Sequence, residues 1–177
     1  PGESASSHMA RVGEWRAKMA NSSEERLVDC LKSIEWGKEP DIICGIANGE
    51  VRVQVQLPGI ESVPTARYKV EMSPVPRIAI RRSTGAQRNE IYTRYICSIV
   101  MAVADAIIIA MPEMKNAKIE ARRQGERGSV IAALEVIRGH WRLNEVETDS
   151  LDRFLQMGGI ISPGANGKLA AVKSILK

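Results

Sequence analysis

The chain has 177 residues, with 25 Lys and Arg against 21 Asp and Glu, which gives a formal net charge of +4 at pH 7. A hydrophobic content of 44% excludes wholesale disorder, and the length suits one domain with a sizeable core. Aromatic residues make up only 4% of the chain, so a nucleic-acid surface built on stacked aromatic side chains is poorly supplied.

The N-terminal region differs in composition from the rest of the chain. Residues 1–8 resemble the remnant of a removed expression tag, and Met9 is the expected natural start. Residues 9–21 are polar and basic around Trp15, and we expect them to form a mobile N-terminal arm. Residues 22–177 are expected to form a single globular domain. We expect no signal peptide, because the first thirty residues contain no continuous apolar run.

The first elements of the domain have clear local signals. Ser22 and Glu25 have the spacing of a capping box, which predicts a helix that continues to Ile34. Asn48-Gly49 predicts a two-residue hairpin turn. The register of this turn places apolar residues opposite one another: Ile46 with Val51, Cys44 with Val53, and Ile42 with Val55.

Two short strands and a long helix are predicted next. One strand contains Tyr68, Val70 and Met72, and the other contains Ile78 and Ile80. Asn89 is expected to cap a helix over residues 90–111. Residues 95–111 approach the length of a membrane span, but Asp105 lies among them, which favours a buried helix. Three helically spaced residues are expected in the core: Ile99, Val103 and Ile107.

The C-terminal half predicts two strands, a short helix and a hairpin. Residues 117–122 alternate as a half-exposed strand, and residues 129–138 indicate a buried strand, although a helix stays an alternative there. Thr148 or Asp149 starts a helix that ends at Gly158-Gly159, before a terminal hairpin. The predicted class is therefore α+β: an antiparallel sheet packed on a long central helix, with a C-terminal short helix plus β-hairpin.

The sequence offers little material for catalysis, so we predict that the chain is not an enzyme and needs no cofactor or metal. The cysteines Cys30, Cys44 and Cys97 lack metal-ligand spacing and are expected to be reduced core residues of an intracellular protein. His140 has no evident partner and is interpreted as structural or exposed. One enzymatic alternative is a divalent-metal site for phosphodiester cleavage, formed by Glu50, Glu71 and Glu120 with Lys69 or Lys118.

Basic residues and one aromatic residue are the stronger functional candidates. A membrane- or phosphate-contact surface is predicted from two groups of cations, the first of which has no acid between its members. These cations are Arg77, Arg81, Arg82 and Arg88, and then Lys118, Arg122 and Arg123. In the arm, Trp15 with Arg11, Arg16 and Lys18 is predicted to mediate self-association through an apolar pocket with an acidic rim on a neighbouring subunit.

The C-terminal residues also carry a family resemblance. Their order is Asp149, Phe154, Leu155, Met157, Gly158, Ile160 and Ile161, then a turn with Gly167, then Val172, Ser174, Ile175 and Lys177. This order resembles the C-terminal end of rhabdovirus matrix proteins over about the last thirty residues. The rest of the chain is similar to that family in size, charge and layout.

The resemblance implies a non-enzymatic virion protein that self-associates, condenses the viral nucleocapsid and links it to the membrane envelope. Its implied partners are itself, the nucleocapsid, an anionic membrane surface and RNA. Its implied locations are the virion beneath the envelope and the cytoplasm, membranes or nucleus of the host cell. The chain lacks the Pro-Pro-x-Tyr motif of animal-virus members, which fits a plant-infecting member. A sequence-independent nucleic-acid-binding protein that uses the same arginines is the main alternative, ahead of a metal-dependent nuclease.

Overall fold

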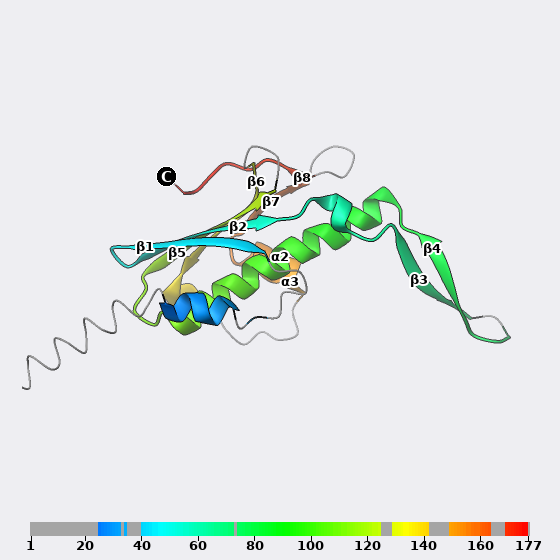
Figure 1. Cartoon of the computed structure of the whole chain (residues 1–177), viewed down its shortest axis with the longest axis horizontal. Helices are drawn as coiled ribbons and strands as arrows, with labels where there is room; N and C mark the ends of the chain where they lie inside the picture. The colour runs from blue at the N-terminus through cyan, green and yellow to red at the C-terminus, as the bar shows by residue number, and fades with distance from the viewer. Residues whose placement is uncertain are drawn as a thin grey trace, which may run out of the picture.

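The computed structural model describes residues 25–32, 34, 40–72, 74–124, 129–141, 149–163 and 169–176. It confirms the α+β class, with a sheet packed on one long helix (Figure 1). Residues 25–32 are helical, as predicted. The predicted cap Ser22, the tag remnant and the N-terminal arm lie outside the described residues.

Six strands form the main sheet in the spatial order β1-β2-β5-β6-β7-β8. Their bounds are Asp41–Ala47, Glu50–Leu57, Asn116–Arg123, Val130–Ile137, Ile160–Pro163 and Leu169–Ala170. All neighbouring strands are antiparallel except β2 and β5, which are parallel. The sheet is therefore mixed rather than wholly antiparallel, because the chain between β2 and β5 returns through a helix that crosses the sheet.

The first hairpin has the predicted register. Ile46 pairs with Val51, Cys44 with Val53 and Ile42 with Val55. Asn48 and Gly49 have positive φ angles of 55° and 78°, as a two-residue type I′ turn requires. The apolar residues of β2 therefore all lie on the face of the sheet that meets the long helix.

The long helix α2 (Gly85–Ala110) starts earlier than predicted. Its cap is Thr84 instead of Asn89: Thr84 Oγ1 accepts a 3.2 Å hydrogen bond from the Gln87 backbone, and Gln87 Oε1 accepts one of 3.1 Å from the Thr84 backbone. This capping box satisfies two N–H groups at once, whereas Asn89 lies in the helix interior. The helix ends at Ala110, before Pro112.

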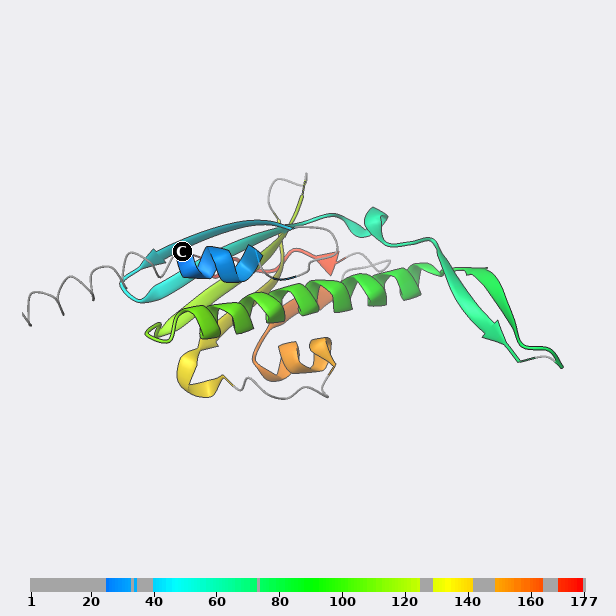
Figure 2. The same cartoon turned by 60° about the horizontal axis from the view of Figure 1, so that its bottom comes forward.

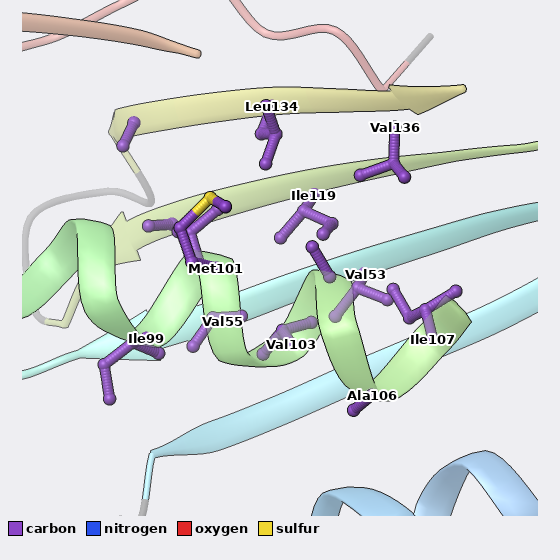
Figure 3. Packing of buried hydrophobic residues seen from close by; sticks show 14 of the residues in the cluster. Val53, Val55, Ile99, Met101, Val103, Ala106, Ile107, Ile119, Leu134 and Val136 are labelled. Carbon is purple, nitrogen blue, oxygen red and sulfur yellow. The ribbon is translucent and has the colours of Figure 1, made fainter. Parts of the chain in front are cut away.

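The core lies between α2 and the sheet. Figure 2 shows α2 against one face of the sheet and α3 (Ser150–Gln156) on the other side of α2. Ile99, Val103 and Ile107 are buried, as predicted. Figure 3 shows the α2 side chains packed against those of three strands: Val53 and Val55 from β2, Ile119 from β5, and Leu134 and Val136 from β6.

Helix α2 is long and apolar enough to span a membrane, by length and composition only. Its position in the fold is that of a core helix, because most of its apolar side chains are buried against other elements. Asp105 is also accommodated there: its carboxylate accepts hydrogen bonds of 2.8 and 2.9 Å from Arg153 and one of 2.9 Å from Trp141. The interpretation as a buried helix is consistent with this packing.

The C-terminal elements differ partly from prediction. Asp149 caps α3 through a 2.9 Å hydrogen bond from the Leu151 backbone, and Gly158 follows the helix with a φ of 81°. The strand β6 forms as predicted, and the 3-10 turn η2 (Arg138–His140) follows it. Strands β7 and β8 form the predicted hairpin, but β8 stops at Ala170, and residues 171–176 are not in a strand.

Strands β3 (Ala66–Glu71) and β4 (Arg77–Arg82) form a separate two-stranded sheet. They follow the 3-10 turn η1 (Ile60–Ser62) and project away from the body of the molecule (Figures 1 and 2). Both strands were predicted, but their separation from the main sheet was not. We call this projecting hairpin, residues 66–82, the β3/β4 arm.

Candidate interaction surface

The β3/β4 arm has one apolar face. Tyr68 pairs with Ile80 and Val70 with Ile78, and side chains at alternate positions of a strand lie on the same face. Met72 continues this alternation just beyond β3, and Val75 adds a further exposed apolar side chain in the connection between the strands. All six side chains are exposed, with 79% of Tyr68, 83% of Met72 and 71% of Ile78 accessible to solvent.

The opposite face of the arm is charged. On this face, Arg67 of β3 lies opposite Arg81 of β4, and Glu71 lies opposite Arg77. Glu71 forms ion pairs with both Arg81 and Arg77, the second at 3.4 Å. The hydrogen bond from Arg81 is the main cause that lowers the pKa of the Glu71 carboxyl below its usual value. Two of the predicted phosphate-contact arginines are therefore partly neutralised by an acid from the neighbouring strand.

The base of the arm carries the most available cations. Within the described part of the chain, neither Arg67 nor Arg82 has an ion-pair partner, and both are exposed. Arg82 follows Ile80 on the apolar side of β4, opposite Ala66. Arg82 is therefore the arginine of the first predicted group that is most accessible to a phosphate, because the other three are engaged by Glu71 or by backbone carbonyls.

Arg88 has a structural position. It lies in the first turns of α2 and donates hydrogen bonds of 2.9 and 3.2 Å to the backbone carbonyls of Ile60 and Val63. These bonds fasten the η1 turn, and with it the start of the arm, to α2. Arg88 therefore has a different role from the three arginines of β4, although these four residues are close in sequence.

The second predicted group of cations lies on β5 and is engaged within the chain. The Nζ atom of Lys118 lies 3.6 Å from Oε1 of Glu50. Both side chains are on the outer face of the sheet, which is the face turned away from α2. Arg122 pairs with Glu120 at 2.7 Å, and Arg123 donates a 3.2 Å hydrogen bond to the carbonyl of Leu169. These three cations hold strands and the C-terminal segment together.

Glu120 occupies an unexpected environment. Strand alternation predicts that it is solvated, but the described C-terminal residues 169–176 cover it, and its side chain is fully buried. One carboxylate oxygen accepts hydrogen bonds from the Ser174 hydroxyl and from the backbone N–H groups of Ile175 and Leu176. Burial raises the pKa of this carboxyl, but these bonds and that of Arg122 outweigh it, so the pKa lies below the usual value of a glutamate.

The alternative metal site is not assembled. Glu50 is on the outer face of the sheet, Glu71 is on the arm, and Glu120 is buried beneath the C-terminal segment. Among the residues that the structure describes, no three His, Cys, Asp or Glu side chains are grouped to hold a metal ion. The three carboxylates proposed for phosphodiester cleavage are therefore not brought together.

The remaining reactive side chains show no shared site. His140 is exposed on η2, as one of its two interpretations predicted. The described cysteines are not disulfide-bonded, and burial raises the pKa of Cys97 to about 12, which leaves its thiol protonated and unreactive at neutral pH.

A groove of about 420 Å³ lies beside the edge strand β1. Its lining is mostly apolar, with one acid and one base: Val28, Leu31, Pro40, Ile42 and Cys44, with Asp41 and Lys32. The apolar lining is of the kind expected for the pocket that receives the N-terminal arm, but the rim is not acidic, because Lys32 accompanies Asp41. The arm residues Arg11, Trp15, Arg16 and Lys18 themselves lie outside the described residues.

Comparison with known proteins gives no relative. No protein-family model matches the chain, no curated protein matches it, and no solved structure matches its fold. Function is therefore inferred from the surfaces described above.

Proposed function

We propose that the chain is a viral matrix protein, a non-enzymatic protein that self-associates, condenses the nucleocapsid and links it to the membrane envelope. One observation carries the proposal: the β3/β4 arm projects from the body with a largely exposed apolar face and with cations at its base. An exposed apolar surface of this extent is typical of a protein that functions in contact with a partner.

The charge distribution supports contact with phosphates. Arg67 and Arg82 lie at the base of the arm, and an exposed cation near an anionic membrane contributes about 1 kcal/mol to binding. The same cations can neutralise RNA phosphates in a nucleocapsid. The groove beside β1 supplies a second surface, which we assign to Trp15 of a neighbouring copy.

A sequence-independent nucleic-acid-binding protein is the second candidate. The observation that favours it is the exposed ring of Tyr68, which lies on the same face of the arm as Arg82. Stacking of a base on an aromatic ring beside a cation is a common mode of single-strand binding. In this case the arm would bind RNA directly, and lipid would not be a partner.

Two binding assays distinguish these candidates. The matrix proposal predicts that the full chain floats with vesicles of phosphatidylcholine and phosphatidylserine, less so as salt is raised, and not with phosphatidylcholine alone. Binding of a labelled single-stranded RNA without any flotation would replace the proposal by the second candidate. Metal-dependent cleavage of that RNA would instead support the nuclease alternative.

A further inference from the structure

The apolar face of the β3/β4 arm has no cover among the described residues. It consists of Tyr68, Val70, Met72, Ile78 and Ile80, with Val75 in the connection between the two strands, and each of these residues is at least 60% exposed. The strands nevertheless pair over six positions, from Ala66 with Arg82 to Glu71 with Arg77. An isolated two-stranded hairpin is at best marginally stable in water, so this arm needs a surface that covers its apolar face.

Lipid is a poor cover for this face. In the described structure, β3 and β4 pair only with each other, so each strand has one open edge with free backbone N–H and C=O groups. Such groups cannot be left unsatisfied in hydrocarbon, where open sheet edges do not occur.

The face has the area and chemistry of half a protein interface. Six apolar side chains with roughly 100–200 Å² each give a total on the order of 800 Å², which is what one partner contributes to a standard stable complex. Between Tyr68 and the tip, this face carries no charged side chain, while the other face carries all the charges of the central pairs. The face is therefore complementary to a copy of itself.

We propose that the apolar face of the β3/β4 arm packs against the same face of a second copy of this chain and forms a two-fold symmetric dimer. This inference deepens the proposed function, since it assigns the self-association of the matrix protein to a specific surface. A two-fold contact between identical faces closes at the dimer. A second contact, such as that of Trp15 with the groove, is then needed to extend the dimer into a layer.

The test compares two variants of one strand in the full chain, without lipid. Ile78→Glu places a charge on the apolar face, and Ala79→Glu places the same charge on the opposite face, across from Lys69. Sedimentation velocity over a range of concentrations should show a dimer for the wild type and for Ala79→Glu. It should show a monomer for Ile78→Glu, with at least tenfold weaker association.

A second measurement separates dimer contact from folding of the arm. Hydrogen exchange should protect the β3 and β4 amides in the wild type and expose them in Ile78→Glu, while the amides of α2 and β5 stay protected in both. A wild-type chain that stays monomeric, or Ile78→Glu chains that dimerise as well as the wild type, would overturn the inference. Loss of vesicle flotation in Ile78→Glu with no change in association would assign the face to lipid instead. If the chain dimerises through the arm but neither floats nor assembles further, the inference stands and the matrix function fails.

Discussion

The hydroxyl of Ser174 donates a 2.6 Å hydrogen bond to the carboxylate of Glu120, in the middle of β5. The same oxygen accepts the backbone N–H groups of Ile175 at 2.6 Å and Leu176 at 3.1 Å. One buried carboxylate therefore fastens the C-terminal segment over the outer face of the sheet. Arg122 donates to its other oxygen, so the charge of Glu120 is compensated where it is buried.

Replacing Glu120 with Ala should destabilise the fold. The variant removes the carboxylate that accepts hydrogen bonds from Arg122, Ser174 and two backbone N–H groups, so we expect the free energy of unfolding to fall by about 2–4 kcal/mol. Chemical denaturation measures this loss. Glu135→Ala is the matched control, because Glu135 is exposed on the same face of the sheet, and its effect should stay within about 0.5 kcal/mol.

The pH dependence of stability gives a second readout of Glu120. Because the pKa of Glu120 is lower in the folded chain than in the unfolded chain, its stabilisation is fully present above the unfolded pKa of about 4.3 and is lost as the pH falls through the folded pKa. The wild type should therefore lose stability from about pH 5 downward more steeply than Glu120→Gln. Parallel curves would show that this carboxylate does not link pH to stability.

The second prediction concerns the core helix. Val103 is completely buried in α2, so Val103→Asp places an unpaired charge in the core and should unfold the chain. Ile109 lies on the same helix but is 65% exposed, so Ile109→Asp should keep nearly the native melting temperature. Circular dichroism melts compare the two variants. Native melting of Val103→Asp would mean that this side of α2 is not a core surface.

The third prediction concerns the cations at the base of the arm. Arg67→Glu with Arg82→Glu should reduce partitioning onto phosphatidylserine vesicles by at least about tenfold at low salt. Arg88 is kept, because its bonds to Ile60 and Val63 are structural. Lys115→Glu with Lys173→Glu makes the same charge change elsewhere on the exposed surface and serves as the control. If both double variants lost vesicle partitioning equally, binding would depend on the net charge of the chain and not on the cations at the base of the arm.

The fourth prediction concerns the N-terminal arm. Trp15→Ala should remove an interface anchor, which typically contributes at least about 2 kcal/mol, and so prevent assembly beyond the dimer. Met19→Ala changes another apolar residue of residues 9–21 and should assemble normally. Light scattering measures the assemblies. Assembly of Trp15→Ala at wild-type concentrations would refute the prediction, and a lower melting temperature of the unassembled variant would indicate that Trp15 folds back onto its own domain.

Local signals predicted much of the fold. The Asn48-Gly49 turn and its apolar register were correct, as were the boundaries of α3 within a few residues. The start of α2 was misplaced because Asn89 is also a good capping residue, and the choice of Thr84 depends on its reciprocal bonds with Gln87. Local patterns determine such features because their partners lie within a few residues.

The other features that the sequence did not predict depend on distant partners. Glu120 resembles a solvated strand residue until the segment around Ser174, more than fifty residues later, covers it. Glu71 pairs with Arg77 and Arg81 only because β3 and β4 are neighbouring strands. The absence of acids between these arginines in the sequence therefore suggested more uncompensated positive charge than the folded arm carries. Likewise, alternation in β3 predicts a strand but not which sheet it joins.

Electron microscopy of the full chain at low salt, with anionic vesicles present, tests the central proposal most directly. A matrix protein should form ordered assemblies that coat the vesicles, and these should dissolve when salt is raised because the cation–phosphate contacts are screened. Bare vesicles beside dispersed monomers at every salt and protein concentration would contradict the account.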